Sequence, residues 1–307
     1  SDKHNIALSV KSEVNKRLSV TGRINFDYLK VYGAGVAGNG TNEGGSNVDA
    51  KFNKMVQILQ YRPTIGIRGN DPDLLAGEDP VLSDADGNVM QNPLIAAAEE
   101  KDNKETRTLQ ANGGLTFKIM KGLTLSVQGA ANYSHVPSYS FTSSLAKPGQ
   151  ISGMENASRM NLFWQNTNNV TYNTSFGDHH LTATAVFEAS GAEGRNLKLT
   201  GSDLANEFVG YWNAKNAKTR DGENGYSAEA IVSGLGRIMY NYKGKYMLTG
   251  TFRADGSSKF QKKNKWGYFP SAAVAWDVAK ENFMSKQNIV QQLKLRASFG
   301  VVGNQSI

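Results

Sequence analysis

The chain has 307 residues, enough for one large domain, with 32 glycines, 7 prolines and no cysteine. The lack of cysteine excludes disulfides and thiol chemistry, and no stretch approaches the ~20 apolar residues of a membrane-spanning helix. The net charge of +7 is spread along the chain, and its one basic cluster, at residues 259–265, matches no nucleic-acid-binding motif, so we expect no nucleic-acid partner.

Alternation of apolar and polar residues is the strongest pattern in the sequence. Leu123 and Leu125, for example, alternate with Thr124 and Ser126 in a segment that matches the roughly 9–11 residues of a bilayer-crossing strand. The segment 161–172 alternates poorly, and the sequence gives no reason for it. In chain order, we predict strands at residues 4–14, 17–32, 104–119, 122–136, 157–176, 180–190, 226–242, 245–256, 267–279 and 291–302.

Short and long connections alternate between the predicted strands. Short turns are expected at residues 15–16, 120–122, 177–178 and 243–245, and long loops at 33–103, 137–156, 191–225 and 257–266. Short turns at one end and long loops at the other are typical of an outer-membrane β-barrel, whereas the loops of a sandwich cluster at both ends. Only the connection at 280–290 is longer than this rule expects. Within the first long loop, short helices are predicted at 53–59 and 92–100.

The placement of charged and aromatic residues in the predicted strands also favours a membrane location. Lys and Arg lie mainly on the polar side of the predicted strands, which would line a watery lumen, because a charge facing lipid costs about 2–4 kcal/mol at the bilayer midplane. Aromatic rings near strand ends suit the two membrane interfaces. The residues predicted to form these aromatic girdles are Tyr28, Tyr133, Tyr240, Tyr242, Tyr246 and Trp276.

Two loop sequences partly match ligand-binding motifs. Residues 33–38 fit G-x-G-x-x-G, but the dinucleotide motif needs a helix to begin within it, and the glycine- and asparagine-rich continuation favours a loop. Residues 84–88 resemble the start of a calcium loop, although Gly87 is at the fourth position and Ile95 at the twelfth, where an EF-hand needs Glu. We expect a tight turn there and no cofactor, with bound calcium as the alternative.

No catalytic arrangement is found in the sequence. The histidines at positions 4, 135, 179 and 180 match no zinc-binding spacing, and no nucleophile elbow or phosphate-binding loop is present. The carboxylates are too scattered to propose an acid–base pair. We therefore expect no catalytic, cofactor-binding or metal-binding residue, and no enzymatic activity.

Four aromatic residues lie in the predicted long loops, Tyr139 and Phe141 in one and Tyr211 and Trp212 in another. They could stack on the sugar rings of a substrate. Packing of the two loops against each other is the favoured interpretation.

Three runs near the end of the sequence are unusually specific: R-A-D-G-S-S-K-F from Arg253, W-G-Y-F-P-S from Trp266, and L-K-L-R-A-S-F-G-V-V-G-N-Q from Leu293. In order and spacing they resemble the SusC/RagA family of TonB-linked outer-membrane transporters. The residues that carry the resemblance are Arg253, Asp255, Gly256, Ser257, Ser258, Phe260, Trp266, Gly267, Tyr268, Phe269, Pro270, Ser271, Leu295, Arg296, Gly300, Gly303, Asn304 and Gln305.

The resemblance implies a plugged barrel of about 22 antiparallel strands in the outer membrane of a Gram-negative bacterium, with its long loops outside the cell. It also implies a SusD-like surface lipoprotein as a lid, and TonB-driven import of oligosaccharides or peptides. We expect residues 1–307 to form part of such a barrel, with the plug and the C-terminal strands absent from this chain.

The motif residues are expected to serve the barrel architecture. We predict a turn at 255–258, rings of Trp266, Tyr268 and Phe269 at the outer interface, and a strand that opens at Pro270.

Two other functions stay open at this point. A passive porin or surface adhesin would share the barrel but not the coupling to TonB. A soluble β-rich carbohydrate-binding protein would bury its rows of Leu, Val and Phe between two sheets.

Overall fold

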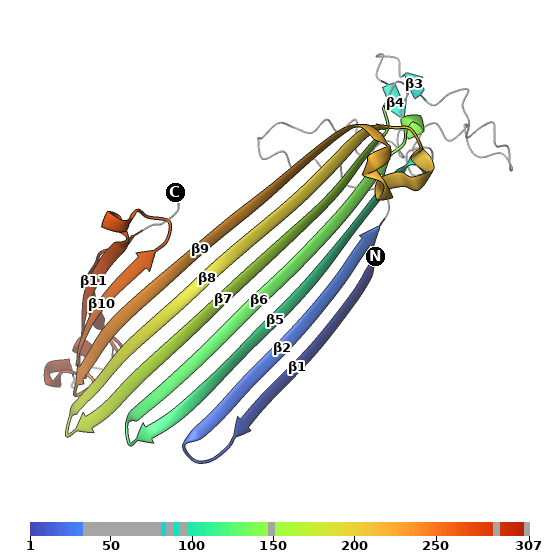
Figure 1. The fold of residues 1–307 in the computed structure, drawn as a ribbon. Helices are drawn as coiled ribbons and strands as arrows, with labels where there is room; N and C mark the ends of the chain where they lie inside the picture. Colours follow the sequence, from blue (N-terminus) through green and yellow to red (C-terminus); the bar gives the residue numbers. More distant parts are fainter. Residues whose placement is uncertain (33–80, 84–88, 92–97, 147–150, 285–288, 304–307) are drawn as a thin grey trace.

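The computed structural model describes residues 1–32, 81–83, 89–91, 98–146, 151–284 and 289–303. Ten antiparallel strands form one curved sheet in the order β1-β2-β5-β6-β7-β8-β9-β10-β11-β12, and β3 (Val81–Ser83) and β4 (Val89–Gln91) form a separate pair (Figure 1). The strands of the large sheet are β1 (Asp2–Glu13), β2 (Leu18–Tyr32), β5 (Glu100–Met120), β6 (Leu123–Thr142), β7 (Gly153–Phe176), β8 (His179–Leu204), β9 (Ala217–Tyr242), β10 (Tyr246–Ser257), β11 (Trp266–Asp277) and β12 (Lys294–Gly300).

All ten predicted strands are confirmed, but β6 to β9 are longer than the sequence pattern indicated. Residues 137–142, 153–156, 191–204 and 217–225, predicted as parts of two loops, are strand, and these four strands contain between 20 and 26 residues each. Strands β8 and β9 pair without a break from His179 opposite Tyr242 to Ser202 opposite Thr219. Backbone hydrogen bonds hold such extensions in register whether or not the side chains alternate, so alternation alone under-predicts them.

Tight turns join the strands at one end of the sheet, as predicted. Gly122, Gly177 and Gly244 have φ values of 82°, 58° and 64°, a region that glycine adopts without a steric cost. A Cβ on Gly122 would lie 2.2 Å from the carbonyl oxygen of Asn173, so this turn requires glycine. The connection after β11 is longer because it contains two short 3₁₀ helices, η6 (Val278–Lys280) and η7 (Asn282–Met284).

Several loop predictions lie outside the described residues and stay predictions. These are the helix at 53–59, most of the helix at 92–100, the glycine-rich run at 33–38 and the candidate calcium loop at 84–88. No helix among the described residues is long and apolar enough to cross a membrane.

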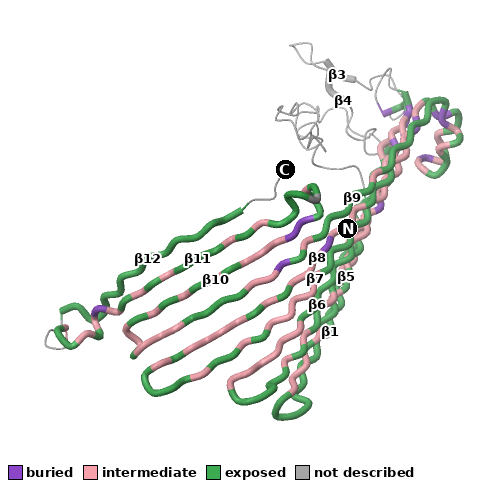
Figure 2. Tube along the Cα trace, turned by 60° about the vertical axis from the view of Figure 1, so that its left-hand side comes forward, coloured by how far each residue is buried: buried purple, intermediate pink, exposed green. Residues whose placement is uncertain are grey.

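The large sheet has one apolar and one polar face. Residues paired across neighbouring strands lie on the same side of a sheet, and the register places Leu125 opposite Val170 and Leu248 opposite Val274. Leu248 and Val274 are both 51% exposed. Among the described residues no second sheet covers these rows (Figure 2). A soluble sandwich would bury them, so this arrangement favours a membrane barrel.

The poorly alternating segment belongs to β7, and its backbone is regular. The register places Asn166 opposite Gly129 and Asn168 opposite Val127, both on the apolar face. Phe163, opposite Asn132, lies on the polar face. The pattern is therefore interrupted by the type of side chain, with no bulge in the strand.

The main buried cluster lies where the long strands extend beyond the others. Phe141, Met154, Leu204 and Ala217 form it, and Tyr211 packs against them. Tyr211 belongs to a 3₁₀ segment, η3 (Glu207–Trp212), in the connection between β8 and β9, which also contains η4 (Ala214–Asn216).

Candidate functional site on the polar face

The three motif runs meet on the polar face, where β10, β11 and the end of β12 are neighbours. Arg253 lies opposite Phe269, Asp255 lies opposite Gly267, and the Val301 N–H donates to the Pro270 carbonyl over 3.0 Å. Together with residues of β8 and β9 they line a hollow of about 630 Å³, which we call the motif hollow.

Arg253 joins three strands in this hollow. Its Nε lies 2.8 and 2.9 Å from the two carboxylate oxygens of Asp255, and its Nη2 donates to Ser233 Oγ over 3.0 Å. Nη2 also lies 3.9 Å from the carboxylate of Glu188. Residues two apart on a strand share a face, and hydrogen bonds between ionised groups are among the stronger ones. The R-x-D pattern therefore holds the Arg253 guanidinium in place on the polar face of the sheet.

Glu188 extends the polar network to β7. Its Oε2 accepts hydrogen bonds from Gln165 Nε2 at 2.9 Å and from Thr167 Oγ1 at 3.1 Å. The motif hollow thus presents a guanidinium, two carboxylates and several hydroxyl and amide groups beside the ring of Phe269. Such a surface can hydrogen-bond to a polar solute and pack against its apolar parts.

The glycines of the motifs make room for aromatic rings. A Cβ on Gly267 would lie 2.7 Å from the Phe269 ring, and one on Gly303 would lie 2.4 Å from it. A Cβ on Gly256 would lie 3.1 Å from the Trp266 ring. The second and third motif runs are therefore linked by one contact. The Phe269 ring lies between Gly267 of the second run and Gly303 of the third.

The prediction for the three rings of the second run is wrong for Phe269. Tyr268 lies on the apolar face and stacks on Phe252, with the ring centroids 6.1 Å apart, and Trp266 is half exposed. Phe269 lines the motif hollow on the opposite face. Successive residues of a strand point to opposite sides of the sheet, so Tyr268 and Phe269 cannot share one.

Two predicted boundaries also need correction. Strand β10 continues to Ser257, so most of the expected turn at 255–258 is strand, and Ser258 ties the turn back to β9 by donating its N–H to Ala230 O over 2.9 Å. Strand β11 begins at Trp266 and contains Pro270. The proline lies opposite Val301, whose N–H donates to the Pro270 carbonyl. Proline has no N–H to return this bond, and the paired part of β12 ends here, with Gly300 opposite Ser271.

The third run is divided between the two faces. Leu295, opposite Trp276, lies on the apolar face, and Arg296, opposite Ala275, lies on the polar face. Gly300 packs closely on Ser271, since a Cβ would lie 3.1 Å from the Ser271 Cβ. Asn304 and Gln305, the last residues of this run, lie outside the described residues. Phe260, the last residue of the first run, lines the motif hollow.

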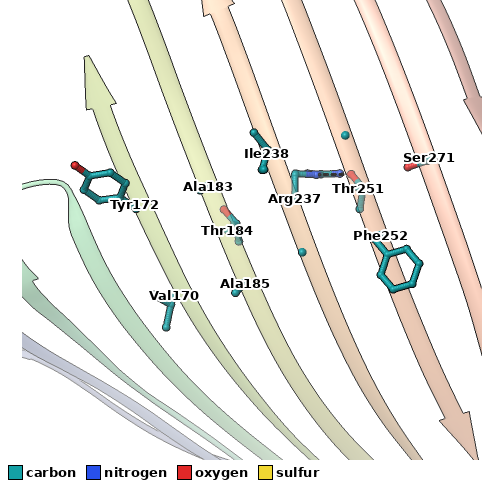
Figure 3. Close-up of a pocket in the computed structure, with 12 residues that line it drawn as sticks. Val170, Tyr172, Ala183, Thr184, Ala185, Arg237, Ile238, Thr251, Phe252 and Ser271 are labelled. Carbon is teal, nitrogen blue, oxygen red and sulfur yellow. Dashed lines mark hydrogen bonds between the residues drawn. The ribbon is translucent and has the colours of Figure 1, made fainter. Parts of the chain in front are cut away.

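A second hollow, of about 620 Å³, lies on the apolar face between the rings of Tyr172 and Phe252 (Figure 3). It forms because Ala183 of β8 and Gly236 of β9, which lie between those rings, fill little of the space. The polar residues along it, Thr184, Arg237, Thr251 and Ser271, occupy positions of the opposite face. Because the polar groups lie on the other face, the motif hollow is the stronger candidate site.

The four loop aromatics come together at the far end of the long strands. Tyr139 stacks on Tyr211 with ring centroids 5.5 Å apart, and Trp212 lies 5.3 Å from Tyr139 and 4.9 Å from Tyr211. Phe141 is buried, whereas Trp212 is 71% exposed. The favoured interpretation, in which the loops pack against each other, agrees with these contacts. Tyr139 lies on the apolar side of β6, away from the motif hollow, and a substrate contact at these residues stays a prediction.

Sequence reasoning missed a polar cluster at the turn end of the sheet. The carboxylate of Glu281 accepts hydrogen bonds from the Tyr246 hydroxyl at 2.7 Å, the Trp276 indole N–H at 3.0 Å and the Lys245 ammonium at 3.0 Å. These donors, led by Tyr246, lower the pKa of Glu281 to about 2. Lys245 and Tyr246 are neighbours in the chain at the start of β10, and Trp276 lies near the end of β11, so no single local motif could have indicated this cluster.

The histidines take part in packing and hydrogen bonds. His179 stacks on Phe176 with ring centroids 5.0 Å apart and lies 4.7 Å from the Tyr242 ring, and His135 Nε2 lies 3.1 Å from Ser158 Oγ. Within the described ranges, no three His, Asp or Glu side chains are placed to hold a metal ion.

Comparison with known proteins adds a family to this geometry. Residues 46–304 match the family model described as TonB dependent receptor-like, beta-barrel. The chain is 31% identical to TonB-dependent receptor P3 of Formosa agariphila over 72% of its length, and 30% identical to TonB-dependent receptor P39 of the same organism over 97%. It spans 22% and 28% of the length of these two relatives.

A shorter match reaches higher identity. TonB-dependent receptor SusC of Bacteroides thetaiotaomicron is 42% identical over 91 residues, which cover 30% of this chain and 9% of SusC. Among solved structures, one titled "Structure of the RagAB peptide transporter" superposes with a TM-score of 0.76 at 19% identity, over 99% of this chain and 33% of the other. That likeness shows the fold, and both matches agree with the SusC/RagA resemblance of the motifs.

Proposed function

Because this chain belongs to the family of TonB-dependent receptor-like β-barrels, we propose that it forms part of the wall of an outer-membrane nutrient importer. One observation supports this most directly: ten antiparallel strands form a single sheet with an exposed apolar face and a polar face. The apolar face suits lipid, and the polar face suits a watery lumen.

We infer that the transported solute is an oligosaccharide or a peptide. The resemblance to the SusC/RagA family implies one of these two classes, and the RagAB structure is titled as a peptide transporter. The motif hollow supports either class, because Arg253 and Glu188 can bind polar groups while Phe269 offers a ring for stacking.

The proposed import also needs partners. A SusD-like surface lipoprotein would cover the mouth on the side of the long loops, and TonB would supply the energy. A passive porin is the second candidate, since its wall would have the same two faces. Dependence on TonB distinguishes the two.

The test uses the full-length protein that contains this chain. It is produced together with the proposed SusD-like lipoprotein, in a strain from which the genes of both proteins have been deleted. Uptake of a panel of labelled oligosaccharides and labelled oligopeptides is measured with and without functional TonB. We expect saturable uptake of one of the two classes, lost without TonB. Uptake that persists without TonB would identify a passive channel and contradict the proposal.

The partner is tested separately by purifying the tagged barrel in mild detergent and identifying the proteins that remain bound. We expect the lipoprotein to copurify in near-equal amount. A barrel that imports solute at full rate after deletion of the lipoprotein would overturn this part of the proposal.

A further inference from the structure

We propose that the connection between β11 and β12 anchors the barrel in the lipid leaflet on the side of the short turns, by inserting the ring of Phe283 at the boundary between phospholipid headgroups and acyl chains. Residues 278–284, which contain η6 and η7, are called the anchor segment. The inference rests on the proposed membrane location of the barrel and does not depend on the solute or on the partner proteins.

The connection that contains the anchor segment is longer than the other connections at this end of the sheet. Those consist of residues 14–17, 121–122, 177–178 and 243–245, whereas this one begins at residue 278 and ends at residue 293. Two residues are enough to join antiparallel strands, and outer-membrane barrels keep the turns at this end short. The reversal of the chain therefore does not account for the added length.

The anchor segment, at the turn end of β11 and β12 (Figure 2), folds back onto the lipid side of the wall. Tyr246 and Trp276 pair with each other, two residues along their strands from the outward pair of Leu248 and Val274. Glu281 accepts hydrogen bonds from the Tyr246 hydroxyl at 2.7 Å and from the Trp276 indole N–H at 3.0 Å. Because both donors are on the outward face, a segment bonded to them lies beside the aromatic girdle and not below the lumen.

Further contacts hold the anchor segment in place. Lys280 Nζ donates to the Gly244 carbonyl over 3.1 Å, and the Ala279 N–H donates to the Leu293 carbonyl over 3.2 Å. Val278 is buried, with 7% of its surface exposed. The segment is thus fixed to the turn between β9 and β10 and to the residue before β12, so its exposed side chains stay close to the girdle.

Phe283 is the exposed apolar side chain that the proposal assigns to lipid. Its surface is 67% exposed, although Glu281, two residues earlier, is tied to the wall. An apolar ring is disfavoured in water, and aromatic rings are favoured at the membrane interface. The side chain of Glu281 is 13% exposed and its charge is met by three donors, so the segment can lie at this depth without burying an unpaired carboxylate.

Two lysines beside the segment suit phospholipid headgroups. The side chains of Lys280 and Lys243 are 55% and 46% exposed, and they lie 3.2 Å from Asp277 and 3.6 Å from Asp178. An ammonium group has three N–H donors, and its flexible stem lets it reach a headgroup phosphate. A periplasmic protein fits this surface less well, because it would have to displace lipid to reach the outward face at the level of the girdle.

Fluorescence quenching tests where the ring lies. The chain has no cysteine, and any cysteine elsewhere in the full-length protein is first replaced by serine. A small fluorescent label is attached at Phe283→Cys, at Val274→Cys in the apolar band, or at Lys121→Cys, which is exposed in the turn between β5 and β6. Each protein is placed in vesicles of phosphatidylethanolamine and phosphatidylglycerol. The quenchers are a phospholipid with a spin label in the upper part of its acyl chain, and aqueous iodide. We expect the lipid to quench the label at 283 at least threefold more than the label at 121, and iodide to give the reverse order.

A second variant tests the attachment of the segment to the wall. Glu281→Ala, added to Phe283→Cys, removes the acceptor for Tyr246 and Trp276 and should reduce quenching by the lipid at least twofold. Asp178→Ala, in another turn at the same end, is the control and should leave the quenching unchanged.

The two proposals fail in different ways. If the lipid quenches the label at 274 while iodide alone quenches the label at 283, the anchor is wrong and the membrane barrel stands. If the lipid quenches neither label, both are wrong. A label at 283 that neither quencher reaches would show that protein covers the segment, and this result would also overturn the anchor, as would an unchanged signal in the Glu281→Ala variant.

Discussion

The two faces of the sheet differ in what constrains their side chains. On the apolar face, Leu248 and Val274 are each 51% exposed, and their side chains need only suit lipid. On the polar face, Arg253 and Phe269 are held by named partners at short distances. The comparison shows that the environment selects residue type on one face, whereas fitted contacts select residue identity on the other. The predictions below test this difference.

The largest effect is expected on the apolar face. Leu125→Lys should destabilise the folded barrel by about 2–4 kcal/mol, because the ammonium group would face lipid near the midplane. Thr124→Lys, one position away on the polar face, is the control and should be nearly neutral. The yield of folded protein in bilayers, measured by heat-dependent mobility on gels, checks both. Equal yields for the two variants would contradict the assignment of faces.

On the polar face, Gly267→Ala should destabilise the barrel by about 1–3 kcal/mol through overpacking. The added methyl group would lie 2.7 Å from the Phe269 ring. Gly234→Ala, where nothing lies within 4 Å, is the control. Urea unfolding in detergent measures the difference, and adding Phe269→Leu to the first variant should restore part of the loss. Identical midpoints for the two alanine variants would show that the ring contact is unimportant.

A smaller loss, of about 1 kcal/mol, is expected for Arg253→Met. The guanidinium is partly exposed, so solvent weakens its ion pairs, but the change removes the hydrogen bonds to Asp255 and Ser233. Arg253→Lys cannot reproduce the forked geometry and should fall between the two. The same urea titration ranks the three proteins, and a lysine variant as unstable as the methionine one would argue against a role for the charge.

The smallest effect concerns the turn end. Hydrogen bonds from Tyr246, Trp276 and Lys245 lower the pKa of Glu281 to about 2 in the folded state, below its usual value of about 4.3. A lowered folded pKa stabilises the protein above the unfolded pKa, and this contribution is lost as the pH falls towards about 2. Glu281→Gln should therefore be less stable than the parent at neutral pH, and the difference should shrink over this range. A difference that does not change with pH would contradict the assignment.

Sequence alternation predicted the part of the fold that lipid enforces. In residues 123–133 every second side chain must suit lipid, so the strand and its faces could be read directly. Beyond the apolar band nothing enforces alternation, and the extensions of β8 and β9 towards Leu204 and Ala217 were predicted as a loop. The pairing of Arg253 with Asp255 could have been predicted from their spacing. The contact of Phe269 with Gly303 could not, because it joins residues of different elements.

The central claim is that one face of the sheet contacts lipid and the other water. Its most direct test is to measure which positions along β11 are accessible to each. Single cysteines at each position from Tyr268 to Asp277, in the full-length protein in bilayers, carry a spin label whose relaxation by oxygen and by a water-soluble nickel complex is compared. We predict a period of two, with oxygen favoured at Tyr268, Ala272 and Val274 and nickel favoured at Phe269, Ser271 and Ala273. A uniform profile, or the opposite phase, would contradict the assignment of the apolar face to lipid.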